Sequence, residues 1–217
     1  MAPKSPTPIR GIICLCHGYM DNTSFLKRLE YQRFVKAGFA VAMIEYEGHG
    51  RSDGTNALIG CWDTLVNDVH AYFEHVTHPE TGNAKLRGKT KFVMGESMGG
   101  AVAYDLMSRH PTSYSGGVIF VCPMCKIVSV PPRWVVQLLY AIIGAPGTVN
   151  SISIMPMAPQ KGNLGELSFK VKEKMWLATS AVSSFGRKPR LATARELLVR
   201  CYIRCIAVYL IGIDCAG

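Results

Sequence analysis

The sequence predicts an α/β protein with a mostly parallel sheet and flanking helices. Between residues 11 and 121, short apolar runs of strand length alternate with longer segments in which apolar residues recur at helical spacing. Such alternation is typical of parallel strands that are joined by crossover helices. The chain has 217 residues, of which 48% are hydrophobic, so it can bury a sizeable core and is expected to form one domain.

The expected strands and helices follow one another without interruption in this part of the chain. The strands are short apolar runs, and one helix carries Leu65, Val69 and Phe73 at the spacing of a single helix face. In chain order, the expected elements are a strand at 12–16, a helix at 25–36, a strand at 39–45, a helix at 64–76, a strand at 91–94, a helix that includes 101–107 and a strand at 117–121.

The turn around Ser97 is the most informative motif. The run Gly95-Glu96-Ser97-Met98-Gly99-Gly100 follows an apolar strand and precedes a helix, which is the setting of a nucleophile elbow. A serine at such a sharp turn takes strained backbone angles, and Gly95 and Gly99 stand where a Cβ atom would clash. Ser97 is therefore the predicted nucleophile.

Three further motifs follow the other expected strands, and together with the elbow they carry a family resemblance. The chain resembles the monoacylglycerol lipase family of α/β-hydrolases, most of all its plant and algal branch, which includes caffeoyl shikimate esterase. The resemblance spans about residues 10–198, and Arg195-Glu196-Leu197-Leu198 is its last recognisable stretch. The three motifs are His17-Gly18-Tyr19-Met20, Tyr46-Glu47-Gly48-His49-Gly50-Arg51-Ser52-Asp53-Gly54 and Cys122-Pro123-Met124-Cys125-Lys126-Ile127.

The resemblance implies a serine ester hydrolase that cleaves monoacylglycerol to fatty acid and glycerol through an acyl-serine intermediate. Ser97 would attack the ester, and the backbone amides of Tyr19 and Met98 would form the oxyanion hole. No cofactor is implied. One alternative is an esterase for lysophospholipids or phenolic esters of the caffeoyl shikimate type, since the family motifs do not fix one substrate.

The family fold also implies a cap. Residues 10–126 would form the sheet core, residues 128–189 an inserted cap or lid, and residues 199–217 a divergent tail of a single domain. The cap segment is rich in proline and lacks clean alternation, and its apolar run 134–143 is expected to be a helix. This helix either packs on the sheet or acts as a lid whose apolar face admits an acyl chain and touches the membrane.

The base that would activate Ser97 is difficult to find. In this fold the acid and the histidine follow the serine, but the only later histidine is His110, thirteen residues along the same helix. At 1.5 Å per residue it lies about 20 Å away, too far to act. His17 and His49 precede Ser97 and could serve only in a rearranged triad; for His17 a hydrogen bond that fixes its loop is expected instead.

Both ends of the expected fold look cut back. Residues 1–11 leave no room for the family's first strand hairpin, and the segment after residue 198 does not resemble the family. Asp214 is the sole acid after the late apolar run 206–211 and is a candidate substitute for the triad acid. The sequence thus predicts a fragment or an incomplete gene model. This leaves a third reading, a catalytically incomplete fragment or lipid-binding remnant without the triad histidine.

Charge and composition limit the partners. The net charge is +9, and residues 126–217 hold 12 of the 24 basic residues but only 4 of the 15 acidic ones. This excess indicates either a solvated basic face or peripheral contact with anionic membrane surfaces, whereas no motif indicates nucleic-acid binding. No apolar run reaches the ~18–20 residues of a membrane span, and the proline-containing N-terminus lacks a signal-peptide pattern, so a cytoplasmic location is expected.

The eight cysteines and six histidines do not suggest a metal or redox site. Several cysteines lie inside apolar runs, where they pack as small hydrophobic residues, and reduced thiols are expected. Cys122-Pro123-Met124-Cys125 has redox-motif spacing without the surrounding thioredoxin pattern. The histidines are scattered, and we expect no metal.

Overall fold

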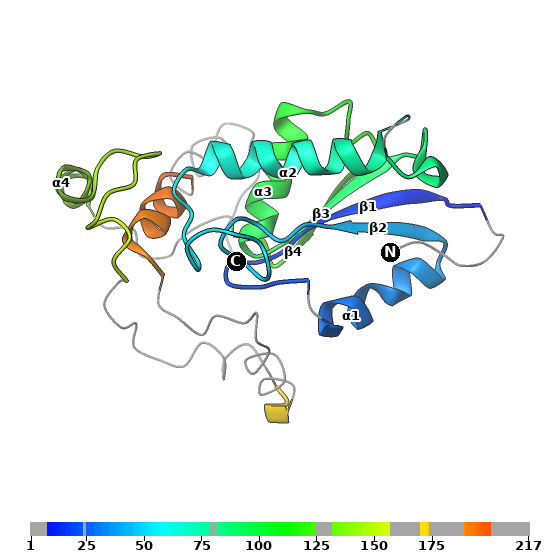
Figure 1. The fold of residues 1–217 in the computed structure, drawn as a ribbon, viewed down its shortest axis with the longest axis horizontal. Helices are drawn as coiled ribbons and strands as arrows, with labels where there is room; N and C mark the ends of the chain where they lie inside the picture. Colours follow the sequence, from blue (N-terminus) through cyan, green and yellow to red (C-terminus); the bar gives the residue numbers. More distant parts are fainter. Residues whose placement is uncertain are drawn as a thin grey trace. The chain divides into compact units, whose positions relative to one another are not determined.

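A computed structural model of the chain describes residues 8–23, 25–78, 80, 82–124, 132–156, 170–173 and 189–200 (Figure 1). The chain divides into two compact units. The first comprises Met1–Tyr46 and Thr64–Met124, and the second Glu47–Asp63 and Cys125–Gly217.

The first unit is built on a four-stranded parallel sheet with the order β2-β1-β3-β4. All four predicted strands are present, but three bounds differ: β1 begins one residue earlier, β2 ends two residues earlier, and β3 ends two residues later, at Glu96. Cys16 at the end of β1 pairs with Gly95 near the end of β3, so the loops that follow these strands leave the sheet side by side. The strands are β1 (Gly11–Cys16), β2 (Phe39–Met43), β3 (Lys91–Glu96) and β4 (Gly117–Val121).

Helices cover both faces of this sheet (Figure 1). On one face, Tyr31 of α1 (Phe25–Lys36) is buried with Ile13 and Leu15 of β1. The opposite face carries α3 (Met98–Arg109), whose residues 98–103 are all buried, and α2 (Trp62–Thr77), which buries Phe73. A short 3-10 helix, η1 (Ala84–Leu86), precedes β3. The predicted α/β class is confirmed, and the helix predicted at 64–76 begins two residues earlier.

The second unit contains α4 (Arg133–Ile143) and a helical stretch at residues 191–200. The helix predicted at 134–143 is therefore present and begins one residue earlier. Of the predicted cap, residues 128–131, 157–169 and 174–188 lie outside the described residues, as do residues 201–217 of the predicted tail.

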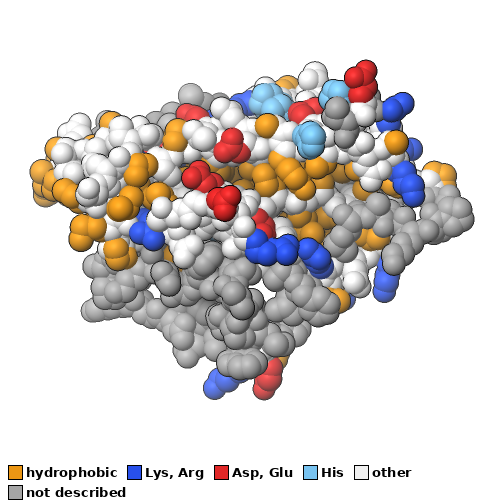
Figure 2. All heavy atoms as spheres, viewed as in Figure 1, with side chains coloured by type: hydrophobic (Ala, Val, Ile, Leu, Met, Phe, Trp, Pro, Cys, Tyr) orange, Lys and Arg blue, Asp and Glu red, His pale blue; other side chains and the backbone are white. Residues whose placement is uncertain are grey.

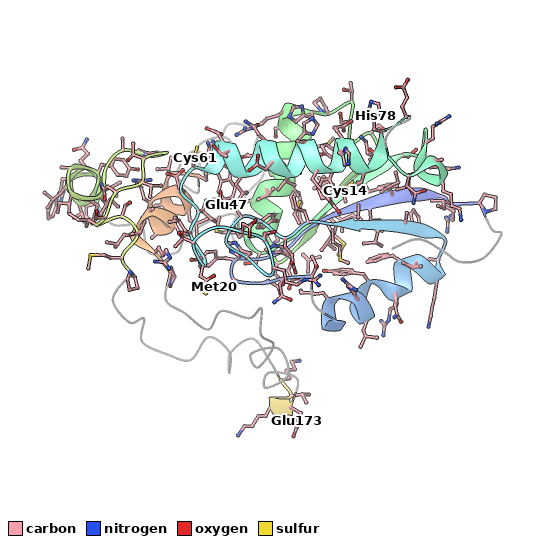
Figure 3. All side chains as sticks on the ribbon, in the orientation of Figure 1. Cys14, Met20, Glu47, Cys61, His78 and Glu173 are labelled. Atoms are coloured by element: carbon pink, nitrogen blue, oxygen red, sulfur yellow. The ribbon has the colours of Figure 1, made fainter. Side chains whose placement is uncertain are left out.

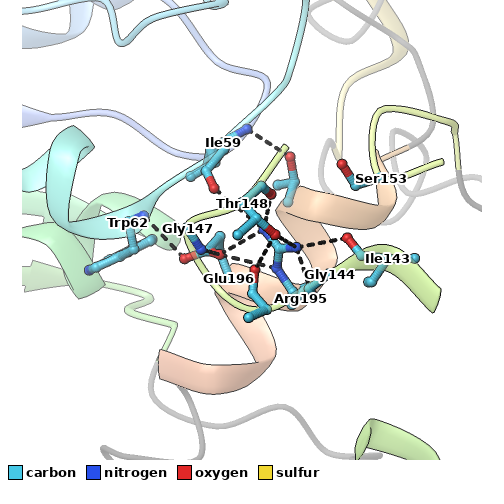
Figure 4. A network of polar contacts seen from close by, with 12 residues as sticks. Ile59, Trp62, Ile143, Gly144, Gly147, Thr148, Ser153, Arg195 and Glu196 are labelled. Atoms are coloured by element: carbon cyan, nitrogen blue, oxygen red, sulfur yellow. Dashed lines mark hydrogen bonds and ion pairs between the residues drawn. The ribbon is translucent and has the colours of Figure 1, made fainter. Parts of the chain in front are cut away.

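A buried ion pair connects three segments of the second unit (Figure 4). The Arg195 guanidinium donates to the carbonyl oxygens of Ile143 at 3.1 Å, Gly144 at 2.9 Å and Thr148 at 2.6 Å. It also pairs with Glu196, 3.1 Å away. The Glu196 carboxylate accepts from the backbone N–H groups of Gly147 at 2.8 Å and Trp62 at 3.1 Å. The pair therefore joins the end of α4, the first residue of α2 and the helical stretch 191–200.

The surface of α4 is unusually apolar. Trp134, Leu138 and Ile142, which recur at four-residue spacing, are 67%, 54% and 50% exposed, and Val149 and Met155 beyond the helix are also exposed. Hydrophobic side chains are visible over this part of the chain in Figure 2. Within the described residues, no helix has both the length and the hydropathy needed to span a bilayer.

Candidate active site

Ser97 lies at the tip of a strained elbow between β3 and α3. Its backbone angles are φ 52° and ψ −118°, which an L-residue adopts only when its surroundings hold it there, and the residue is exposed. Glycine is required at the neighbouring positions 95 and 99 because a Cβ atom would not fit there. A Cβ at Gly95 would lie 2.1 Å from the Gly99 carbonyl oxygen, and a Cβ at Gly99 would lie 2.0 Å from the Cys16 carbonyl oxygen.

The backbone of Ser97 is anchored on both sides. Its N–H donates to the carbonyl oxygen of Val121 at 3.0 Å, and its carbonyl oxygen accepts from Gly100 N–H at 3.0 Å and from Met124 N–H at 2.8 Å. Met124 belongs to the motif that follows β4, so that motif has a physical role in holding the elbow.

The loop after β1 lies against the elbow. A Cβ at Gly18 would be 3.5 Å from the Cβ of Ser97, so the structure brings the predicted oxyanion loop and the predicted nucleophile together. Tyr19 follows Gly18 directly, and the loop turns at Met20, which has φ 59° (Figure 3). Met98 is the first residue of α3, so its N–H has no acceptor four residues earlier within the helix.

His17 fixes this loop, as predicted. Its Nδ1 lies 2.7 Å from the Gly18 carbonyl oxygen, to which it donates, and its Nε2 accepts from the Tyr46 N–H at 3.3 Å. The Tyr46 hydroxyl donates to the His17 carbonyl oxygen at 3.0 Å, and the two rings stack with centroids 3.9 Å apart. Burial, together with the neighbouring Cys16, raises the pKa of Tyr46, which keeps the phenol protonated. Both ring nitrogens of His17 are thus engaged with backbone groups rather than poised as a base.

The other candidates for the base or the acid of a triad are His110, His49 and Asp214. His110 directly follows α3, at the end opposite Ser97, and stacks on His70 with ring centroids 3.6 Å apart, so the prediction that it cannot reach Ser97 is confirmed. His49 belongs to the second unit, where its Nδ1 lies 3.0 Å from the Glu47 carbonyl oxygen. Asp214 lies outside the described residues.

A charged cluster beside the elbow was missed by sequence reasoning. The ammonium group of Lys27 on α1 donates to a carboxylate oxygen of Glu96, the residue before Ser97, and lies 3.1 Å from Asp21 Oδ2 on the loop after β1. Lys27 and Glu96 are 69 residues apart, so no local pattern marks the pair. The available signal was a carboxylate next to the nucleophile and a lysine in the first turn of the expected helix.

The described residues give no sign of a metal centre, because none of them form a group of three or more histidine, cysteine or acidic side chains suited to a metal. Cys14 lies on β1 (Figure 3), and burial raises the pKa of its thiol to about 12. Cys14, Cys16, Cys61 and Cys122 are free thiols. The redox-like spacing of Cys122 and Cys125 stays untested, because Cys125 lies outside the described residues.

Comparison with known proteins places the chain in a family. The family described as "Serine aminopeptidase, S33" matches residues 7–198. The chain is 28% identical over 191 residues to caffeoylshikimate esterase from Arabidopsis thaliana, covering 88% of this chain and 54% of the relative. It is 30% identical over 118 residues to monoacylglycerol lipase from Mycolicibacterium smegmatis, covering 52% of this chain and 38% of the relative. The chain thus spans about half, or less, of the length of these relatives.

Solved structures agree on the fold. The monoacylglycerol lipase of Paleococcus ferrophilus superposes with a TM-score of 0.65 at 18% identity, covering 91% of this chain and 69% of that chain. A soluble variant of the Saccharomyces cerevisiae monoglyceride lipase, solved with a substrate analogue, gives a TM-score of 0.65 at 19% identity, covering 92% of this chain and 62% of that chain. These likenesses show the α/β-hydrolase fold.

Proposed function

Because the chain belongs to the serine aminopeptidase, S33 family of α/β-hydrolases, we propose that it carries the nucleophile of a serine ester hydrolase of the monoacylglycerol lipase type. One observation carries the proposal: Ser97 is exposed on a strained elbow, and the Gly18 loop packs directly against it. Backbone strain of this kind persists only where the surrounding contacts hold the residue in place, and strained residues of this kind are common at catalytic sites.

In the proposed reaction, Ser97 Oγ attacks the ester carbonyl and loses its proton to a base. The N–H groups of Tyr19 and Met98 stabilise the negative charge on the carbonyl oxygen, the alcohol leaves, and water then releases the acyl group from the serine. The start of α3 at Met98 favours this role, since the positive end of the helix dipole faces the developing charge. We assign the base to no described residue.

The proposed substrate is a monoacylglycerol, which would be cleaved to a fatty acid and glycerol. The names of the Mycolicibacterium relative and of the Paleococcus structure support this choice. The Arabidopsis relative, named as a caffeoylshikimate esterase, supports the alternative of a phenolic ester, and a lysophospholipid belongs to the same reaction class. Parallel turnover measurements with a monoacylglycerol, a lysophospholipid and a caffeoyl ester would rank the three.

We further propose that the apolar face of α4 contacts acyl chains or the surface of a membrane. Its three most exposed apolar residues lie along one helix face, and surface patches of this kind mark interaction sites. The protein would then act at a membrane surface from the cytoplasm, with its free cysteines in a reducing compartment.

A fluorophosphonate probe tests the nucleophile. We expect covalent labelling of the folded chain, loss of labelling in Ser97→Ala, and full labelling in Ser108→Ala, which removes another exposed serine from α3. A triad without its base loses several orders of magnitude in rate but keeps the residual catalysis of the oxyanion hole, so labelling is to be followed over hours. Folded wild-type chain that stays unlabelled would instead support the lipid-binding remnant.

A charge on α4 tests the apolar surface. Leu138→Asp should lower binding to vesicles of anionic phospholipid, and turnover of long-chain esters more than of short soluble ones. Leu29→Asp is the matched control, because Leu29 is 43% exposed on α1. Equal losses in the two variants, or equal losses on long and short esters, would contradict the proposal.

A further inference from the structure

Lys27 connects two parts of the candidate site that are far apart in the sequence. On one side its ammonium group lies 3.1 Å from Asp21 Oδ2, and on the other it donates to Glu96. Asp21 comes two residues after the predicted oxyanion donor Tyr19, and Glu96 comes immediately before Ser97. One cation therefore bridges the loop after β1 and the nucleophile elbow.

Hydrogen bonds hold Asp21 in the loop after β1. Its N–H donates to the Gly18 carbonyl oxygen at 3.2 Å, and its Oδ1 accepts from the N–H of Asn22 at 2.8 Å. Thr23, two residues after Asp21, donates from both its N–H and its hydroxyl group to Glu45 Oε1, each at 2.9 Å. A displacement of Asp21 would therefore move the whole turn that carries Tyr19.

The bridge is largely shielded from water. The side chain of Lys27 is 15% exposed, against 30% for Asp21 and 34% for Glu96. Burial acts to lower the pKa of Lys27, but the charge of Asp21 and the hydrogen bond to Glu96 outweigh it and raise the pKa above its ordinary value. Lys27 thus stays charged throughout the physiological pH range, and charge-assisted hydrogen bonds of this kind are the stronger ones.

We propose that Lys27 is a positioning residue that sets the distance between the oxyanion loop and Ser97. The two amides that would bind the oxyanion, those of Tyr19 and Met98, come from opposite sides of this bridge. An oxyanion hole works only when both donors meet the same oxygen at hydrogen-bond distance, and small misplacements are costly. The proposal rests on the function proposed above and names a residue that acts on the site without touching the substrate.

The kinetic test compares Lys27→Met with Arg28→Met, which removes the same charge from the exposed neighbouring position. With a soluble short-chain ester, we expect Lys27→Met to lower kcat by roughly 10- to 100-fold while KM changes by less than about 3-fold. Lys27→Arg should recover most of kcat, because a guanidinium can also bridge two carboxylates. A kcat of Lys27→Met within 2-fold of the Arg28→Met value, in a wild-type background where turnover depends on Ser97, would overturn the proposal.

A second measurement does not need turnover. Amide hydrogen exchange of residues 18–23 should accelerate on the order of 10-fold in Lys27→Met and stay at the wild-type rate in Arg28→Met and Lys27→Arg. Unchanged exchange in Lys27→Met would overturn the proposal even if the chain is active. Accelerated exchange in a chain without Ser97-dependent turnover would support the bridge and refute the proposed function instead.

Discussion

Arg195→Met should lower the free energy of unfolding far more than Arg200→Met, which removes a charge five residues later on the same helical stretch. The Arg195 side chain has no exposure, whereas that of Arg200 is 20% exposed and pairs with Asp63, which is 56% exposed, at 2.6 Å. Both substitutions remove one guanidinium and keep a long, flexible side chain. The two variants therefore differ mainly in the hydrogen bonds and ion pairs that the lost guanidinium made.

The expected loss follows from the partners left behind. Without Arg195, the buried carboxylate of Glu196 loses its cationic partner. The carbonyl oxygens of Ile143, Gly144 and Thr148 each lose a hydrogen-bond donor. Breaking one side of a buried ion pair costs about 3–5 kcal/mol. Loss of an exposed pair such as that of Arg200 costs about 0–1 kcal/mol. The gap between the two variants should therefore be at least about 2 kcal/mol.

Urea unfolding followed by tryptophan fluorescence measures this difference, because the Trp62 side chain is fully buried and the backbone N–H of Trp62 donates to Glu196. The double variant Arg195→Met/Glu196→Leu should recover part of the loss, since it no longer buries a lone charge. Equal midpoints for the Arg195 and Arg200 variants would refute the reasoning, as would a double variant less stable than Arg195→Met.

Three further outcomes follow from the first unit. Gly99→Ala should lower the free energy of unfolding by about 3 kcal/mol, measured by denaturation, because its Cβ would lie 2.0 Å from a carbonyl oxygen of β1. Burial, then the stacked neighbouring histidine, lowers the pKa of His70 below 6.5, so the unfolded chain binds more protons than the folded one. Stability therefore falls as the pH drops below about 6.5, and His70→Gln should flatten that slope; an unchanged slope in this variant would contradict the burial argument. Iodoacetamide at pH 8 should alkylate exposed Cys122 before Cys14, whose thiol has a pKa of about 12, and equal rates would contradict the burial argument.

Local patterns predicted the elements, whereas long-range contacts set their ends. The elbow at Ser97 was predictable in part because one of its clashes is local: a Cβ at Gly95 would meet the carbonyl oxygen of Gly99, four residues later, whereas Gly99 itself is required by Cys16 on β1. The start of α2 was not, because the Trp62 N–H is satisfied by Glu196, 134 residues away. Similarly, β2 ends before Glu45, whose carboxylate accepts two hydrogen bonds from Thr23. The Lys27 bridge depends on the order of the strands, which no single segment encodes.

The pairing of Cys16 with Gly95 makes the elbow a reporter of how the sheet has assembled. A slip of one residue between β1 and β3 would shift the Gly18 loop along the sheet by about 3.3 Å and turn every β1 side chain to the opposite face. Reactivity at Ser97 therefore requires more than compactness or helix content: it requires these two strands in their native register. A covalent probe of the serine would count correctly assembled molecules, and in refolding experiments its signal should lag behind the recovery of helical circular dichroism.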